Sequence, residues 1–150
     1  MTKSATELYQ EVVLAHNRDP RGYGELLEAS RQGEGFNPIC GDQINVQIIM
    51  SDETIERVGF TARCCALCRA SASVMTTVMS GLSMEAAEEK FKDFEIMIQG
   101  RGARLDGDAA AFAAIAQYPA RAKCVILPWK TFFSALKEST PAALAVSTES

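Results

Sequence analysis

The chain has 150 residues, of which 47% are hydrophobic and 23% are charged, and its formal net charge at pH 7 is −4. This length and composition predict a single globular domain that is large enough to bury a core, and they exclude a disordered chain. The acidic balance argues against a nucleic-acid-binding protein, which needs a basic face. No apolar run approaches the ~20 residues of a membrane span, so no membrane partner is expected.

The N-terminal segment and the cysteines indicate where the protein works. Residues 1–7 lack the basic and then apolar pattern of a secretory signal, so we expect a cytoplasmic protein. The chain has five cysteines, an odd number that fits poorly with a disulfide framework. Because cytosolic thiols stay reduced, clustered cysteines favour metal binding or sulfur chemistry.

In chain order, the spacing of apolar residues first predicts an amphipathic helix over 6–17. Proline and glycine break this pattern over 19–24. A polar, glycine-rich passage over 31–37 then leads to the first cysteine without a predicted element. Alternating apolar residues over 44–49 and a second run over 55–61 predict two strands that form an antiparallel hairpin.

Everything after Cys64 is predicted to be helical. Four helices are expected, over 65–80, 83–100, 106–117 and 124–137. Ser83 is the expected cap of the second, and Pro128 falls within about the first turn of the last, where a missing amide is tolerated. A small sheet followed by helices indicates an α+β domain over 1–139, and residues 140–150 are predicted to be a flexible tail.

Three cysteines lie in separate stretches, each beside a turn or a predicted helix start: Cys40, Cys65 and Cys124. Asp42 follows the first of them by two residues. Three thiolates and one carboxylate are the four donors that a tetrahedral zinc ion or a small iron–sulfur cluster needs. The sequence therefore favours a sulfur and metal site. The alternative for Cys40 is a buried, inert thiol beside a turn aspartate.

The second cysteine belongs to a cluster of Cys64, Cys65 and Cys68 where a strand becomes a helix. Free amides and the dipole of a helix N-terminus stabilise a thiolate there. Cys65 and Cys68 also form a Cys-x-x-Cys pair, which leaves a redox function open. That function usually requires a parallel βαβ unit, whereas the expected sheet is antiparallel. One or two of these thiols could instead fill the core.

Basic residues accompany the cysteines. Arg121 and Lys123 precede the last cysteine, and Arg63 and Arg69 flank the middle cluster. A Zn²⁺ ion with four singly negative ligands carries a net charge of −2, which these cations could offset; otherwise they are solvated surface. The sole histidine, His16, is assigned a structural role in preference to metal binding.

Three cysteine motifs in order make the chain resemble the NifU/IscU-like iron–sulfur cluster assembly family, and within it the SufU branch. The motifs are Asn37-Pro38-Ile39-Cys40-Gly41-Asp42, Cys65 followed by Ala70-Ser71-Ala72-Ser73, and Tyr118-Pro119-Ala120-Arg121-Ala122-Lys123-Cys124. The resemblance implies an α+β fold with a small three-stranded antiparallel sheet packed by about five helices. It also implies that Cys40, Asp42, Cys65 and Cys124 are the metal ligands. Lys123, where IscU-like chains carry histidine, favours SufU.

The resemblance implies a function in iron–sulfur cluster assembly. SufU-like proteins bind zinc and accept persulfide sulfur from a SufS-type cysteine desulfurase, whose pyridoxal phosphate (PLP) belongs to that partner. By this analogy Cys40 is the acceptor, Arg121 and Lys123 support the site, and other SUF components are possible partners. Such a protein is a sulfurtransferase-like partner of the desulfurase and not a stand-alone enzyme. Two alternatives are a scaffold that assembles and transfers a [2Fe–2S] cluster, and a purely structural zinc site.

The chain departs from the family pattern at two positions. Cys64 stands where the family usually has glycine, and Cys68 stands where serine is common. We interpret both as accessory thiols that do not bind the metal. They could also relay a persulfide or form a reversible disulfide with Cys65.

Overall fold

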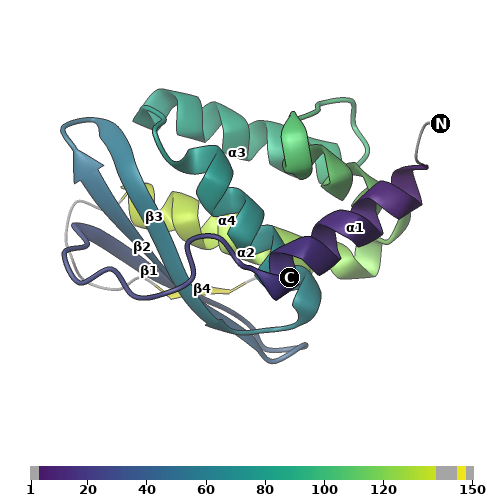
Figure 1. Ribbon diagram of the computed structural model, residues 1–150, viewed down its shortest axis with the longest axis horizontal. Helices are drawn as coiled ribbons and strands as arrows, with labels where there is room; N and C mark the ends of the chain where they lie inside the picture. Colours follow the sequence, from purple (N-terminus) through teal and green to yellow (C-terminus); the bar gives the residue numbers. More distant parts are fainter. Residues whose placement is uncertain (1–3, 138–144, 148–150) are drawn as a thin grey trace.

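A sheet with a layer of helices on one of its faces makes up the fold (Figure 1). The computed structural model describes residues 4–137 and 145–147, the last three by their backbone alone. The elements follow in the order α1 (Ala5–Arg18), β1 (Arg31–Asn37), β2 (Asp42–Ser51), β3 (Thr54–Arg63), α2 (Ala66–Met79), α3 (Met84–Ile98), η1 (Gly107–Gln117), η2 (Pro119–Arg121), α4 (Ala122–Lys137) and β4 (Ala145–Ser147).

The strands are arranged in the order β3-β2-β1-β4. The first three strands of the chain form the expected antiparallel sheet, with Asn37 opposite Asp42 and Gln43 opposite Arg63. Four α-helices and the 3₁₀ helix η1 supply the five expected helices, so the predicted α+β fold is confirmed. The short strand β4 adds a parallel neighbour to β1. The rest of the predicted tail over 140–150 lies outside the described residues.

Strand β1 has no counterpart among the predicted elements, because its glycines hide the usual alternation of apolar residues. Gly33 and Gly35 are buried and face α4. A Cβ atom on Gly35 would collide with the side chain of Thr131 in that helix. Glycine therefore lets the helix approach the strand backbone closely, which holds the start of α4 near the end of β1.

Two predictions about the helices were wrong in detail. The alanine-rich stretch 106–117 forms a 3₁₀ helix, in which Ala109, Phe112 and Ile115 are buried at every third residue and share one edge. This packing overrides the α-helical propensity of alanine. Helix α4 begins at Ala122, two residues earlier than predicted, so Pro128 lies in its second turn and not in its first. Ser83 caps α3 as predicted, accepting from the amide of Ala86 at 3.2 Å.

Large side chains of the helical layer and the sheet form one core. Trp129, Phe132 and Phe60 are fully buried, and Trp129 stacks on Phe94 with ring centroids 3.8 Å apart. Phe133 stacks on Phe91 at the edge of this core, at 4.6 Å. Burial of this area supplies the main stabilising free energy of the domain and fixes α4 against the sheet. Among the described helices, none is both long and apolar enough to cross a membrane.

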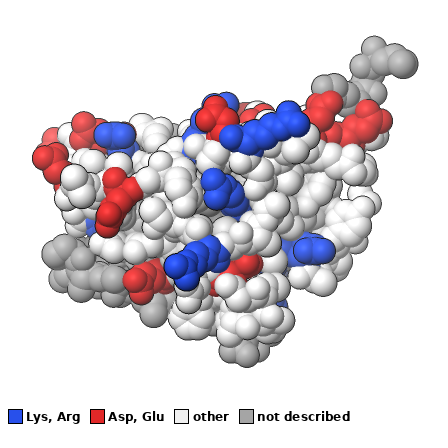
Figure 2. Space-filling model, turned by 60° about the horizontal axis from the view of Figure 1, so that its bottom comes forward, with Lys and Arg blue, Asp and Glu red and all other residues white. Residues whose placement is uncertain are grey.

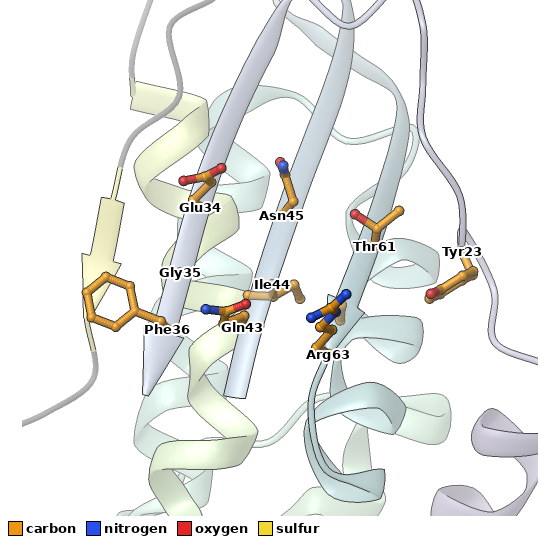
Figure 3. A pocket seen from close by; sticks show the side chains of 10 residues that line it. Tyr23, Glu34, Gly35, Phe36, Gln43, Ile44, Asn45, Thr61 and Arg63 are labelled. Carbon is orange, nitrogen blue, oxygen red and sulfur yellow. The ribbon is translucent and has the colours of Figure 1, made fainter. Parts of the chain in front are cut away.

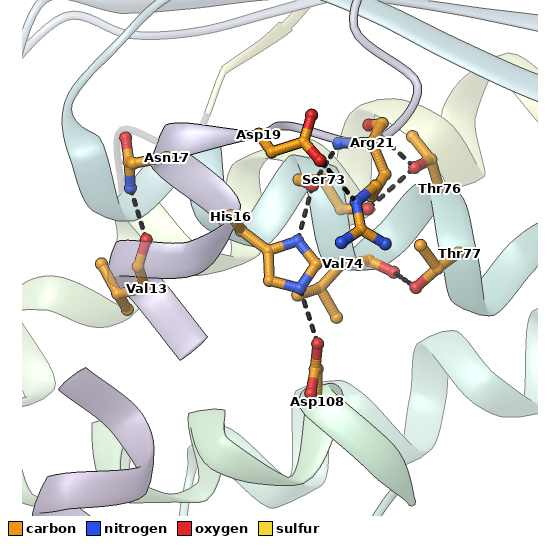
Figure 4. Close-up of polar contacts among 10 residues, drawn as sticks. All are labelled: Val13, His16, Asn17, Asp19, Arg21, Ser73, Val74, Thr76, Thr77 and Asp108. Atoms are coloured by element: carbon orange, nitrogen blue, oxygen red, sulfur yellow. Dashed lines mark hydrogen bonds and ion pairs between the residues drawn. The ribbon is translucent and has the colours of Figure 1, made fainter. Parts of the chain in front are cut away.

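His16 ties three elements together (Figure 4). The ring is buried on α1, its Nδ1 lies 2.6 Å from Ser73 Oγ on α2, and its Nε2 lies 2.7 Å from Asp108 Oδ2 on η1. The amide of Arg21 also donates to Ser73 Oγ, at 2.7 Å. Both ring nitrogens are occupied by these contacts, as the structural role assigned to His16 requires.

Charged side chains of both signs are interspersed over a largely uncharged surface on the face drawn in Figure 2. Among the described residues on that face, lysine and arginine form no continuous stripe.

Candidate metal centre

The four predicted ligands meet where one end of the sheet adjoins the starts of two helices. Cys40 lies in the turn between β1 and β2, and Asp42 is the first residue of β2. Cys65 follows β3 and is the N-cap of α2. Cys124 lies in the first turn of α4. Residues from 40 to 124 are thus brought to one place by the sheet register and by the packing of α4 on β1.

Three of the four donors form a tight group. The ligand atoms of Cys40, Asp42 and Cys124 all lie within 4.8 Å of one another, and the Sγ atoms of Cys40 and Cys124 are 3.8 Å apart. Cys65 is not part of this closest group. Its Sγ nevertheless lies 3.7 Å from Asp42 Oδ2. Sequence reasoning named all four residues, and the structure brings them together.

These distances suit a single ion. Zinc–sulfur bonds of about 2.3 Å in tetrahedral geometry place two thiolates ~3.8 Å apart, and a thiolate and a carboxylate oxygen ~3.5 Å apart. The separations of 3.8 Å between Cys40 and Cys124 and 3.7 Å between Cys65 and Asp42 are close to these edges. The donor set is also the one that zinc and iron–sulfur chemistry use. The residues therefore fit a metal ion.

Asp42 and Cys65 are held by the N-terminus of α2. The backbone amide of Cys65 donates to Asp42 Oδ1 at 2.9 Å, and the Cys65 thiol accepts from the amide of Cys68 at 3.4 Å. Asp42 is buried, with 2% exposure. One carboxylate oxygen is thus fixed by a hydrogen bond from the helix end, and the other points at a sulfur ligand. Hydrogen bonds of this kind orient metal ligands in proteins.

Cys40 lies on an exposed turn that its neighbours shape. The amide of Ile39 donates to Asn37 Oδ1 at 3.2 Å, and the amide of Gly41 donates to the backbone oxygen of Asn37 at 2.8 Å. Gly41 has φ +76°, in the left-handed region that favours glycine. Cys40 is exposed, so the inert, buried alternative for this thiol is wrong.

Burial keeps two of the thiols protonated when no metal is bound. Burial raises the pKa of the Cys65 thiol, and the Asp42 carboxylate adds to this effect against an opposing hydrogen bond from the Cys68 amide. Burial also raises the pKa of the Cys124 thiol, with further contributions from Cys65 and Cys40. A metal that binds here must therefore displace protons from sulfur, so its affinity depends on pH.

Cys64 and Cys68 form a separate pair of thiols. Cys68 is fully buried, and its pKa is raised by a hydrogen bond with the Cys64 thiol and by burial. Neither thiol belongs to the group of donors around Cys40. This arrangement is compatible with accessory thiols, whose role stays a prediction.

The predicted supporting cations precede Cys124 in the chain, by three residues and by one. Arg121 is exposed at the end of η2, and Lys123 is half-buried in the first turn of α4. Burial raises the pKa of Tyr9 on α1, and the charge of Arg121 opposes that rise.

Sequence reasoning missed a cavity on the open face of the sheet (Figure 3). Its volume is about 450 Å³, and Tyr23 and Phe36 stand at its two sides. Its floor is mostly polar and is formed by Glu34, Gln43, Asn45, Thr61 and Arg63, among others. The alternation of polar residues along β2 is the signal that could have indicated a solvated sheet face. No cysteine is among the described residues that line this cavity.

Asn37 was noticed only as part of a motif. Its side chain is 1% exposed, and its Nδ2 is buried without a hydrogen-bond partner among the described residues. An Asn-Pro pair at the end of a strand is a turn signal. The sequence alone does not show that this amide is buried.

Comparisons with known proteins agree with this architecture. The family model of the NifU-like N-terminal domain matches residues 8–125. The chain is 35% identical over 126 residues to the zinc-dependent sulfurtransferase SufU of Bacillus subtilis, which covers 82% of this chain and 85% of that protein. It is 34% identical over 140 residues to the iron–sulfur cluster assembly scaffold protein IscU of Streptococcus pyogenes, which covers 90% and 86%.

A solved structure of similar fold is a putative iron–sulfur cluster assembly scaffold protein for the SUF system from Fervidobacterium islandicum. It superposes with a TM-score of 0.80 at 30% identity and covers 89% of this chain and 100% of that one. A nitrogen-fixing NifU-like protein from Brucella abortus superposes with a TM-score of 0.77 at 20% identity, over 89% of this chain and 96% of that one. The latter likeness concerns the fold alone.

Proposed function

The chain belongs to the family of NifU-like N-terminal domains, and from that premise we propose that it is a zinc-bound sulfur acceptor in iron–sulfur cluster assembly. Cys40, Asp42, Cys65 and Cys124 hold the ion, and a SufS-type, PLP-dependent cysteine desulfurase supplies the sulfur. The observation that carries this proposal is the group formed by the ligand atoms of Cys40, Asp42 and Cys124, all within 4.8 Å of one another. The Cys65 sulfur lies 3.7 Å from the same carboxylate, and Cys40 is exposed. The relative SufU of Bacillus subtilis bears the description zinc-dependent sulfurtransferase.

Bound zinc would stabilise the ligand sulfurs as thiolates at neutral pH. The protein residues do the rest. The α2 amide fixes Asp42, the helix start buries Cys124, and the turn from Asn37 to Gly41 presents Cys40 to solvent. Three donors are thus anchored in regular structure, and one donor lies where a partner can reach it.

Sulfur transfer is a thiol–persulfide exchange at Cys40. The Cys40 thiolate attacks the terminal sulfur of the partner's cysteine persulfide. A new sulfur–sulfur bond forms at Cys40, the sulfur–sulfur bond of the partner breaks, and the partner's cysteine leaves as a thiolate. The reaction conserves atoms and electrons, and it needs no outside oxidant or reductant. A reducing compartment such as the cytoplasm keeps the acceptor thiol available.

The cations near the centre assist the encounter. Both the persulfide and the ligand set are negative. Arg121 is exposed three residues before Cys124, and Lys123 lies in the same turn of α4 as Cys124. Positive charge at this position attracts an anionic persulfide and offsets the net charge of the centre. Release of the sulfur then delivers it to other SUF components.

A second function is supported by a different relative. The IscU protein of Streptococcus pyogenes, which covers 90% of this chain, is described as a scaffold. The same donors suit a [2Fe–2S] cluster, which the protein would assemble and transfer. In that case the cluster is cargo and not a resident cofactor.

Metal analysis joined to a sulfur-transfer assay tests the proposal. Protein purified without oxygen should contain one zinc ion per chain, remain colourless and stimulate a cysteine desulfurase. Mass spectrometry should then find one extra sulfur on Cys40. A brown protein with iron and sulfide, and no stimulation of the desulfurase, would establish the scaffold function instead. Zinc without stimulation would leave only a structural metal site.

A further inference from the structure

Asn37 carries a hydrogen-bond donor that its own turn does not use. Its Oδ1 accepts from the amide of Ile39, and its backbone oxygen accepts from the amide of Gly41. Its Nδ2 is buried, and within residues 4–137 and 145–147 it has no partner. A buried donor without an acceptor destabilises the folded state. Such a donor in a functional turn points to an acceptor that arrives with the working state of the protein.

The register of β1 against α4 locates this donor. Gly33, Gly35 and Asn37 are the buried residues of β1 and face the helical layer, whereas Glu34 and Phe36 are exposed. A Cβ atom on Gly33 would lie 3.1 Å from the Cβ of Ala135 in α4.

The neighbours of Gly35, the next inward residue of β1, show in which direction α4 runs along the strand. A Cβ atom on Gly35 would meet Thr131 and would lie 3.1 Å from Leu127 Cδ1. Each step of two strand residues covers ~6.6 Å, and it matches about four helix residues, which cover ~6 Å. Asn37 is the next inward position of β1 and pairs with Asp42 across the ladder. The ligand atoms of Asp42 and Cys124 lie within 4.8 Å of each other, so Asn37 lies on the side of the sheet where α4 begins.

We propose that Asn37 donates an N–H···S hydrogen bond from Nδ2 to the metal-bound thiolate of Cys124. This inference rests on the proposed function, because it requires a metal at the centre. Cys124 is 2% exposed and Asn37 is 1% exposed, so water has little access to either group. Asn37 acts through the ligand and is a positioning residue.

The hydrogen bond makes the two neighbouring sulfurs unequal. A donor on a thiolate stabilises its negative charge and lowers its nucleophilicity, and contacts of this kind orient metal ligands. Cys124 thereby becomes a lasting ligand. Cys40, whose sulfur is 3.8 Å away on the exposed turn, remains the sulfur that leaves to react. The amide oxygen of Asn37 shapes the turn of Cys40, and the amide nitrogen stabilises its neighbour.

Two substitutions separate the two atoms of the amide. Asn37→Asp keeps an oxygen that can accept from Ile39 but loses the N–H donor, whereas Asn37→Ala loses both. Cobalt(II) serves as the spectroscopic probe, because its thiolate-to-metal charge-transfer band shifts to longer wavelength when a hydrogen bond to sulfur is lost. We expect a shift in both variants, together with at least about a tenfold loss of zinc affinity in competition with a chelator.

Asn45→Asp is the matched control, since it makes the same change on β2 and its side chain lies on the open face of the sheet (Figure 3). It should leave the cobalt band and the zinc affinity unchanged. Circular dichroism checks that each variant is folded, and the alanine variant keeps the test valid if the aspartate variant does not fold.

The outcomes separate the inference from the proposed function. If folded Asn37→Asp has the band and the zinc affinity of the unmodified protein, and only Asn37→Ala is defective, Asn37 serves the turn alone and the inference is wrong. If the unmodified protein binds cobalt without any thiolate charge-transfer band, the proposed metal centre itself is wrong.

Discussion

Two cysteines of the candidate centre, Cys40 and Cys124, have sulfur atoms 3.8 Å apart but very different surroundings. Cys40 is exposed on a turn between two strands, with a left-handed glycine directly after it. Cys124 is 2% exposed in the first turn of α4, packed between that helix and the sheet. Cys40 can move without disturbing regular structure, whereas Cys124 cannot.

This contrast shows how one set of donors can serve both binding and transfer. A site that only binds a metal gains from four anchored ligands. The conformational entropy of these side chains is then already lost on folding and does not reduce the affinity for the metal. A site that also accepts sulfur needs one ligand that can leave at low cost. The following predictions test that division.

The largest effect is expected from removing each sulfur in turn. Cys40→Ser should abolish persulfide formation, a loss of at least about a hundredfold, because serine is a poor nucleophile toward sulfur, and the fold should persist. Cys124→Ser should lose stoichiometric zinc and, with it, the ~3–4 kcal/mol by which a tightly bound ion stabilises the folded state. Mass spectrometry and thermal unfolding measure the two effects. Equal losses of zinc and stability in both variants would contradict the division.

A smaller effect is expected from separating β1 and α4. Gly35→Ala places a Cβ against Thr131, and overpacking of this kind costs about 1–3 kcal/mol. Because β1 leads to the turn of Cys40 and α4 begins with Cys124, zinc affinity should fall as well. Gly33→Ala, which meets Ala135 at 3.1 Å farther from the centre, is the control. Urea unfolding and zinc competition should rank Gly35→Ala as the more damaging, and the reverse order would count against this coupling.

The accessory thiols should matter still less to the metal. Cys64→Ser and Cys68→Ser should each retain one zinc ion per chain, while Cys65→Ser should not, because the Cys65 sulfur lies 3.7 Å from the Asp42 carboxylate. Cys68→Ser should lower stability by about 1 kcal/mol, since its side chain is fully buried. Metal analysis decides the point. Zinc lost from Cys64→Ser or Cys68→Ser but kept in Cys65→Ser would reassign the ligand.

The smallest effect is expected from pH on the metal-free protein. The pKa values of Cys65 and Cys124 are raised above the ordinary value of 9.0, chiefly by burial. The folded state therefore holds these protons to higher pH than the unfolded chain. The stabilising contribution is complete below about pH 9 and is lost as pH rises toward the folded pKa values. Urea unfolding in chelator should show this decline, and Cys124→Ser should show less of it.

Local signals explain which parts of the fold could be predicted. The hairpin of β2 and β3 and the helices α1, α2 and α3 were predicted within a few residues, because apolar spacing and the Ser83 cap are local. Strand β1 was missed because two of its inward positions are glycines, which carry no apolar signal. Glycine is needed at Gly35 because a side chain there would collide with Thr131, which is distant in the sequence. The 3₁₀ form of η1 was missed because alanine favours α-helix unless packing overrides it.

The chemistry can be read from the residues alone: three thiols and a carboxylate stand in recognisable motifs, which indicate the family and the four candidate ligands. Which of those donors are anchored depends on the folded chain, since burial and contacts involve residues far apart in the sequence. The tertiary structure also revealed that the side-chain nitrogen of Asn37 is buried and has no hydrogen-bond partner among the described residues. The chemical type of a ligand donor is set by its own residue, whereas its freedom to move is set by the residues that pack around it.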